Sequence, residues 1–385
     1  MEIIKMVIGG DLVPTKSNYE YFKNGNINKL LGEELENILK ESDYRIFNLE
    51  APITMLENPI KKCGPNLKID PSCFDGIKKL NPSLLNLANN HILDQGNEGL
   101  IETINILKKN NIRFIGIGEN LQKARKGYIL EKNNIKIGIY SCAEREFSIA
   151  TETEMGANPF SFTDTLDDII NFKKKCDYIV VLYHGGKENY RYPAPYLQKR
   201  CRKMIEKGAD IVICQHSHCI GSLEKYQLGQ IIYGQGNFIF DYEDSEFWNT
   251  SILVELKIDK KLIEINCIPI LKKRNIIKKA NLEEEKKIIF AFNKRNEEIK
   301  NKDIVEKRYK ELSENYFYNY LGAFSGLGRI ITGIDRKFLK NIIMKFLFNE
   351  RKKLMLLNYL ECEAHRDLFI EGLRNNLKME GRDKK

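Results

Sequence analysis

The chain has 385 residues, of which 42% are hydrophobic and 30% are charged, a balance typical of a globular protein and not of a disordered one. No stretch approaches the roughly 20 consecutive apolar residues of a membrane-spanning helix, and the N-terminus lacks the pattern of a signal peptide. Nine scattered cysteines without a C-x-x-C spacing argue against a disulfide framework. We therefore expect a cytoplasmic protein with one large domain and an appendage, or with two domains.

The net charge of +9 is concentrated in the C-terminal part of the chain. Residues 271–385 carry 28 Lys and Arg against 17 Asp and Glu, whereas the preceding residues carry 34 against 36. Such a basic segment could meet an anionic polymer, nucleic acid or an anionic membrane surface. The mixed signs of "EEEKK" and "KRNEEIKNKD" equally fit a solvated helical face that binds nothing.

Strands and helices alternate along the first half of the chain. Apolar runs predict strands, and apolar residues spaced three and four apart predict helices. The segment "YILEKNNIKIGIYS" (128–141) alternates on both sides of Asn133-Asn134 and predicts a β-hairpin. The other predicted strands are at 3–8, 44–49, 84–88 and 113–117, and the predicted helices are at 33–41, 73–80 and 97–109.

The same alternation continues to about residue 270 and then stops. Because strands and helices alternate first and hairpins follow, we expect a mixed α/β sandwich. After residue 271 the composition changes, and residues 281–313 and 336–376 contain no convincing strand, which predicts a domain at 1–275 and a basic helical appendage at 276–385. The apolar, Gly-rich stretch at 317–334 predicts a helix–turn–helix connection packed on the main domain, or a membrane-surface segment. The elements predicted between are helices at about 164–175 and 193–207 and strands at 178–186, 210–218, 230–241 and, as a pair, near 250–269.

Polar residues follow these strands at or just beyond their ends. In layered α/β folds the carboxyl ends of strands form the crevice in which ligands bind, so these side chains should share one edge. Four of the five histidines belong to this set, whereas His365 lies in the charged C-terminal part and is expected at the surface. The set comprises Asp11, Asn48, Glu50, Asn90, His91, Asp94, His184, Glu188, His216, His218 and Asn237.

Imidazole and carboxylate together suit Zn, Mn, Fe or Ni. His216 and His218 would share one face of an extended segment, and two metals roughly 3.5–4 Å apart would need about this many ligands, with one carboxylate bridging. Each member also has an ordinary explanation. Asp11 could cap a turn, Glu50 could lie in a loop, and Asn90, His91 and His184 could simply end strands.

Six motifs in this set resemble, in order, the CapA family of bacterial capsule and poly-γ-glutamate synthesis proteins, which has the calcineurin-like metallophosphoesterase fold. The resemblance covers about residues 3–245 and does not extend beyond 275. It implies a four-layer sandwich of two mixed sheets flanked by helices, and a centre of two divalent ions (Mn, Fe or Zn). The motifs are "GGD" (9–11), "FNLEAPIT" (47–54), "NLANNHILDQG" (86–96), "YHGGKEN" (183–189), "QHSHCIGSLE" (215–224) and "YGQGNFIFD" (233–241).

The resemblance also implies metal ligands by motif position. Asp11 and His218 would bind the first metal, and Glu50 would occupy the bridging position. The second metal would be bound by Asn90, His184 and His216.

Two further roles and three departures follow from the same motifs. His91 would be the general acid and Asp94 would hold its ring. Phosphoesterases of this fold usually carry Asp-x-His in the first motif, but position 13 here is Val13, so the first site is one imidazole short. Asn48-x-Glu50 replaces the Gly-Asp of the wider superfamily, and Gly185 replaces an aromatic residue common in the family.

The leading interpretation is a metal-dependent hydrolase of a phosphoester or γ-glutamyl bond in anionic polymer metabolism, with a metal-activated water as nucleophile. Substrate charge would be offset by Arg145, Lys187 and Arg191, with Glu188 and Asn237 lining the site.

The alternative is a non-catalytic accessory or scaffold protein for polymer synthesis or export. It would have a vestigial metal site, partner proteins of capsule synthesis and a location peripheral to the membrane. Nucleic-acid processing is a third interpretation, but no binding motif supports it.

Overall fold

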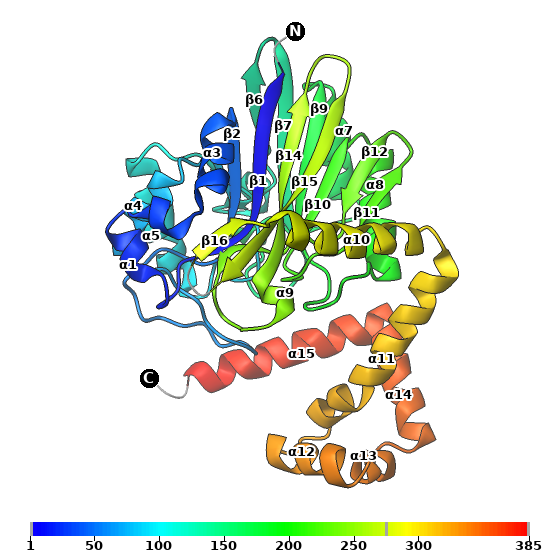
Figure 1. Ribbon diagram of the computed structural model, residues 1–385. Coiled ribbons are helices and arrows are strands. Elements are labelled where there is room, and N and C mark those ends of the chain that lie inside the picture. Colours follow the sequence, from blue (N-terminus) through cyan, green and yellow to red (C-terminus); the bar gives the residue numbers. More distant parts are fainter. Residues whose placement is uncertain (1–2, 274–275, 383–385) are drawn as a thin grey trace. The chain divides into compact units, whose positions relative to one another are not determined.

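The computed structural model describes residues 3–273 and 276–382 (Figure 1). The chain forms two compact units, Met1–Glu306 and Lys307–Lys385. The first contains every strand found in the described part of the chain, and the second is helical. Within the described ranges, no helix is both long enough and apolar enough to cross a bilayer.

The first sheet is built around β1 (Ile4–Val13). This strand runs parallel to β2 (Tyr44–Leu49) and antiparallel to β14 (Thr250–Ile258). From Asp11 onward, β13 (Asn237–Phe240) pairs with β1 in parallel. The strand order is β16-β15-β14-β1-β2-β3-β4, and the remaining strands are β3 (Leu84–Asn86), β4 (Phe114–Ile115), β15 (Ile263–Lys273) and β16 (Ile276–Lys279).

The second sheet has the order β11-β12-β10-β9-β7-β6. The predicted hairpin forms its edge, and Asn133 and Asn134 adopt φ of 53° and 57°. Two consecutive positive φ angles are the signature of a type I′ turn, which asparagine tolerates. The strands are β6 (Tyr128–Lys132), β7 (Ile135–Ala143), β9 (Tyr178–His184), β10 (Ile211–Gln215), β11 (Leu223–Tyr226) and β12 (Gly229–Ile232).

Side-chain alternation along the strands separates two apolar layers. Ile4, Met6 and Ile8 of β1 are fully buried against residues of the second sheet such as Val180 and Leu182. The intervening residues of β1 and its neighbours point the other way and pack on helices, because successive side chains of a strand face opposite sides. The two sheets therefore enclose one core and each turns its other face outward.

Helices cover both outer faces, which completes four layers and confirms the predicted architecture (Figure 1). Leu100, Thr103 and Leu107 of α5, for example, recur at helical spacing and are buried. The helices on the first sheet are α1 (Tyr19–Lys23), α2 (Ile27–Leu30), α3 (Glu33–Glu41), α4 (Phe74–Lys79) and α5 (Gly96–Lys109), and those on the second are α7 (Asp164–Lys173) and α8 (Pro195–Glu206). Shorter elements are α6 (Leu121–Ala124), α9 (Glu246–Asn249), the 3-10 turn Pro71–Cys73 and the small sheet of β5 (Ile117–Gly118) and β8 (Gly156–Ala157).

The first unit continues past residue 275. β16 pairs with β15, so the first sheet extends beyond residue 275; a strand of four residues at a sheet edge has too little periodicity to be recognised from sequence. Helix α10 (Leu282–Glu298) buries Phe292 against Ile220 and Ile252. The compact unit thus ends at Glu306, whereas residue 275 remains the predicted limit of the family domain.

The second unit has a small core of Leu321, Met344 and Phe348. The predicted helix–turn–helix at 317–334 is present, with Gly326 at φ 72° in the turn. The helices are α11 (Lys302–Phe324), which begins in the first unit, α12 (Arg329–Phe338), α13 (Ile342–Leu347), α14 (Glu350–Glu361) and α15 (Glu363–Arg382).

Candidate metal centre

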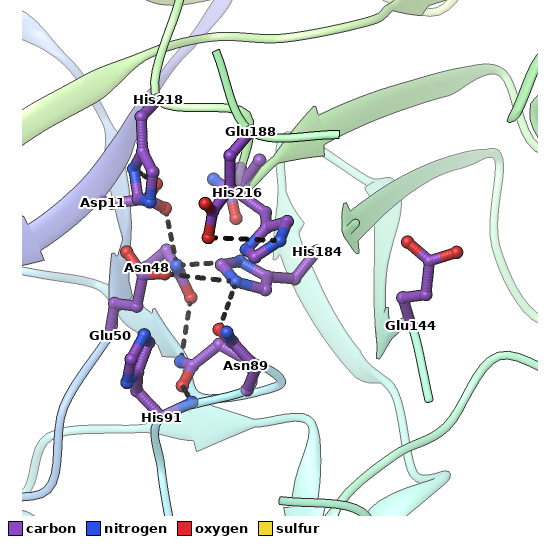
Figure 2. A network of polar contacts seen from close by, with 12 residues as sticks. Asp11, Asn48, Glu50, Asn89, His91, Glu144, His184, Glu188, His216 and His218 are labelled. Atoms are coloured by element: carbon purple, nitrogen blue, oxygen red, sulfur yellow. Dashed lines mark hydrogen bonds and ion pairs between the residues drawn. The ribbon is translucent and has the colours of Figure 1, made fainter. Parts of the chain in front are cut away.

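The strand-end side chains meet at one edge of the two sheets (Figure 2). Asp11 and Asn48 lie on neighbouring parallel strands, and their Cα atoms are partners in the β1–β2 register. From the second sheet, His184 ends β9 and is in register with Gln215 at the end of β10. A layer of buried amides ties the sheets together here, because Gln215 accepts from Asn86 at 3.1 Å and donates to the carbonyl of Gly9 at 3.2 Å.

Two overlapping groups of side chains have metal-binding geometry. In each group the ligand atoms all lie within 4.8 Å of one another. Glu50 belongs to both, and its Oε1 lies 3.2 Å from Nε2 of His184. Glu50 thus has the position that a bridging carboxylate would need. The groups are Asp11, Glu50 and His184, and Glu50, His216 and His218.

Four donor atoms of this centre are buried without a hydrogen bond in the described part of the chain. Asp11 Oδ2, both carboxylate oxygens of Glu50 and Nδ1 of His216 find no hydrogen bond within residues 3–273 and 276–382. Unsatisfied buried polar atoms are rare in native proteins and indicate an ion or water. Two carboxylates among imidazoles match divalent metals of borderline hardness, so these residues fit the expected ions.

Electrostatics within the site follow from burial and from the Asp11–Glu50 contact. Burial alone would raise the pKa of Asp11, but the interactions with His218 and His184 lower it to about 2. Burial, and then the charge of Asp11, raises the pKa of Glu50 well above its usual range. A cation between the two carboxylates would relieve this repulsion.

The pKa values of the three imidazoles of the site shift in different directions. Burial lowers the pKa of His184 to about 3, and burial together with His184 lowers the pKa of His216 well below its ordinary value. Burial also disfavours the charged form of His218, but its interaction with Asp11 raises its pKa overall. Neutral imidazole is the form that binds a metal, so His184 and His216 are already in the ligating state.

The His216–His218 segment differs from the prediction. β10 ends at Gln215, and the two histidines lie in the following loop with φ of 87° and 52°. The expectation that they share one face of an extended strand is therefore wrong. Left-handed backbone at non-glycine residues is uncommon and concentrates at functional sites. Here it brings both imidazoles to the same centre, with ring centroids 5.9 Å apart.

Amide side chains hold the ligands in place. Asn48 donates to Oδ1 of Asp11 at 2.7 Å and accepts from Asn89 at 3.2 Å. Oδ1 of Asn90 lies 3.0 Å from Nε2 of His184, so the predicted ligand Asn90 is beside the group of Asp11, Glu50 and His184. The two adjacent asparagines therefore differ in role: Asn89 supports Asn48, and Asn90 contacts the predicted metal ligand His184.

Position 13 has no polar role. Val13 is buried in the apolar layer between the first sheet and its helices.

The His218 ring is held by an aromatic residue and an amide. It stacks on Trp248 with ring centroids 4.3 Å apart, and its Nδ1 lies 2.8 Å from Oδ1 of Asn237. Asn237, predicted to bind substrate, therefore contacts the predicted metal ligand His218 and does not line the pocket described below.

His91 and Asp94 form a buried pair beside the metal ligands. Nδ1 of His91 lies 2.6 Å from Oδ2 of Asp94, as the sequence predicted for a carboxylate that holds the ring. Sequence reasoning missed Lys62, whose Nζ lies 2.5 Å from Oδ1 of Asp94 and 3.1 Å from Nδ1 of His91. Lys62 lies in an irregular segment with no periodicity, and nothing in its neighbours marks it as buried.

A pocket of about 370 Å³ opens beside His184 and His216. Of the predicted substrate residues, Arg145, Lys187 and Glu188 line it.

Two other acids also line the pocket. Glu144 pairs with Arg200, and burial raises the pKa of Glu146. Arg191 does not line the pocket. Its guanidinium pairs with Glu246 and covers the ring of Phe247, and both partners belong to α9, which is distant in sequence.

Comparison with known proteins gives the family. Residues 5–242 match the sequence profile of a protein family described as bacterial capsule synthesis protein PGA_cap. The capsule biosynthesis protein CapA of Bacillus anthracis is 30% identical over 212 residues, covering 53% of this chain and 52% of that protein. The PGA biosynthesis protein CapA of Bacillus subtilis is 30% identical over 215 residues, covering 54% and 56%.

A more distant relative is the probable polyglutamine synthesis accessory protein Rv0574c of Mycobacterium tuberculosis, 27% identical over 216 residues with 52% and 57% covered. The chain spans about half the length of the curated relatives it matches. Among solved structures it is similar to a phosphatase from Mycoplasma pneumoniae (TM-score 0.45, 16% identity, 76% of this chain and 99% of that one). The match over residues 5–242 confirms the resemblance to CapA proteins, and the chain belongs to the PGA_cap family of bacterial capsule synthesis proteins.

Proposed function

We propose that the protein is a metal-dependent hydrolase that cleaves a phosphoester or γ-glutamyl bond in the metabolism of a capsular or other anionic polymer. The observation that carries the proposal is the set of buried donor atoms on Asp11, Glu50 and His216 without a hydrogen bond among the described residues. His216 also lines a pocket with charged walls, and a histidine–carboxylate pair is formed by His91 and Asp94. A purely structural role would not need unsatisfied carboxylates next to an open pocket.

The assignment of ligands to each ion is the one that the motif positions imply. The two groups in the structure share Glu50 but place His184 with Asp11 and His218 with His216, whereas the 3.4 Å between Nδ1 of His218 and Oδ2 of Asp11 supports the pairing used here. Asp11 and His218 would hold one ion, and Glu50 would bridge. The other would be held by Asn90, His184 and His216. When bound, divalent ions would supply a water of lowered pKa and positive charge against a developing anion.

The chain's own residues would position and protonate the substrate. Since Nδ1 of His91 is turned to Asp94 and Lys62, Nε2 is the atom through which His91 would give a proton to the leaving group. Asp94 fixes the orientation and tautomer of the ring. Arg145 and Lys187 in the pocket lining would bind an anionic group of the substrate.

The second candidate is an accessory or scaffold role in polymer synthesis, with partner proteins. Val13, in the apolar layer where the first motif of related phosphoesterases has histidine, leaves one ion with fewer protein ligands. A relative in M. tuberculosis also carries the word "accessory" in its name. Both observations favour a site that binds metal without turnover.

The test uses the full chain loaded with Mn²⁺, Fe²⁺ or Zn²⁺ and a panel of phosphomonoester, phosphodiester and γ-glutamyl anilide substrates. Metal content is measured by mass spectrometry on the purified protein. We expect His91→Ala to lose activity by about 10²–10⁴-fold while retaining its metal, and His216→Ala to lose both. His365→Ala, an exposed histidine of the second unit, is the control and should match the wild type.

Two results would contradict the hydrolase. Fully metal-loaded protein that turns over none of the panel favours the scaffold. Loss of metal in His91→Ala as complete as in His216→Ala means that His91 has been given the wrong role.

A further inference from the structure

The second unit exposes large apolar side chains on two consecutive helices. Ile330 and Phe338 of α12 are 79% and 76% exposed, and Phe346 of α13 is 83% exposed. Ile334 and Ile342 are also exposed. Single exposed apolar residues are ordinary, but five of them on two consecutive helices indicate an interaction site. We call these five residues the α12–α13 apolar surface.

The apolar stripe of α12 is not the face that packs inside the unit. Ile330, Ile334 and Phe338 are spaced four apart and therefore lie on one side of the helix. The side that is covered carries Asp335, which is fully buried, and Thr332, which is next to Gly322 of α11. The stripe therefore has no partner within the second unit.

The charge around this surface has one sign. Residues 329–346 contain five Lys and Arg and a single acid, Asp335. That acid is turned inward, where its oxygens accept from the backbone N–H of Ile343 at 2.9 Å and of Met344 at 3.0 Å. The solvent-exposed apolar side chains are therefore bordered by positive charge. The bases are Arg329, Arg336, Lys337, Lys340 and Lys345.

We propose that the α12–α13 apolar surface binds the surface of an anionic membrane. An amphipathic helix with bulky apolar residues on one face and Lys and Arg beside them binds at the lipid interface, where the apolar side chains enter the acyl boundary. The bases then lie at the level of anionic headgroups, each contributing to binding. Charge complementarity favours lipid, because this surface offers no exposed acid for a mixed-charge protein partner.

The experiment is flotation of the full chain with vesicles of phosphatidylcholine, alone or with one third phosphatidylglycerol. We expect flotation only with the anionic vesicles, and its loss between 0.1 and 1 M NaCl because the Debye length falls from about 10 to 3 Å. An Ile330→Ser/Ile334→Ser/Phe338→Ser variant should fail to float. An Arg329→Gln/Lys337→Gln/Lys340→Gln variant should bind about a hundredfold more weakly, roughly fivefold for each base removed.

The matched control is Leu262→Ser/Lys260→Gln/Lys261→Gln, which removes exposed residues of the same kinds from the β14–β15 turn of the first unit. It should float like the wild type. Circular dichroism checks that each variant folds, and the wild-type dependence on lipid charge and salt tests the proposal without any variant. Equal flotation with neutral vesicles, or none with either, overturns it. So does a surface that instead joins two copies, seen as a doubled mass that the serine variant returns to a monomer.

Discussion

Replacing Lys62 by methionine tests the arrangement behind His91. The Lys62 side chain is 1% exposed and that of Asp94 is 0% exposed, and their charged atoms lie 2.5 Å apart. Asp94 also accepts from the backbone N–H of Leu67 at 2.6 Å and contacts His91. Methionine keeps an unbranched side chain but removes the ammonium group, which also lies 5.1 Å from the centre of the Phe147 ring, and so leaves the carboxylate without its cation.

The expected loss in the free energy of unfolding is about 3–5 kcal/mol, because removing one partner of a buried ion pair leaves the other charge uncompensated. Lys68 provides the matched control, since it pairs with Glu57 nearby but its side chain is 30% exposed and that of Glu57 is 78% exposed. Lys68→Met should cost no more than about 1 kcal/mol.

Urea unfolding followed by circular dichroism measures both variants. A double-mutant cycle with Asp94→Asn isolates the pair, and Asp94→Asn should cost less in the Lys62→Met background, by about 0.5–3 kcal/mol. The reasoning is refuted if Lys62→Met loses no more stability than Lys68→Met, or if the two substitutions at the pair are additive.

Three further predictions concern the centre and its scaffold. Removal of metal by a chelator should lower the free energy of unfolding by about 2.7 kcal/mol relative to protein in metal at a hundred times its Kd; unchanged urea midpoints would argue against a built metal site. The protein has one tryptophan, and since Trp248 stacks on His218, adding Mn²⁺ or Zn²⁺ should change its emission in the wild type but not in His218→Ala, as a fluorescence titration would show. Gly10→Ala should lower the free energy of unfolding by about 1–3 kcal/mol and reduce metal content, because the new Cβ would lie 1.9 Å from the carbonyl oxygen of Gly236, beside Asp11. The control Gly372→Ala in α15 meets open space and should raise the free energy of unfolding by about 0.5–1 kcal/mol. Equal effects of the two substitutions on urea unfolding would contradict this prediction.

Local pattern was sufficient for most elements. The helix predicted at 33–41 and the strand at 44–49 coincide with α3 and β2, because their apolar spacing reports which face is buried. Asn133-Asn134 identified the hairpin turn, since few residues tolerate two positive φ angles. The family motifs then indicated which strand ends carry polar residues.

Short or irregular segments have no apolar spacing from which their structure could be predicted. β16 has only four residues, and the burial of Lys62 depends on Asp94, 32 positions away in the chain. Arg191, two residues after a family motif, was predicted to bind substrate, yet its partner Glu246 comes from α9, which only folding brings near.

The sequence by itself determined the alternation of strands and helices, the type of residue at each strand end and membership of the family, because these depend on residues close together in the chain or on motif order. Only the tertiary structure decided that Glu50 lies between Asp11 and three imidazoles, that His216 and His218 reach it through left-handed backbone, and that Lys62 supports Asp94. Those contacts join distant segments, and their energies come from burial that no local window of sequence reports.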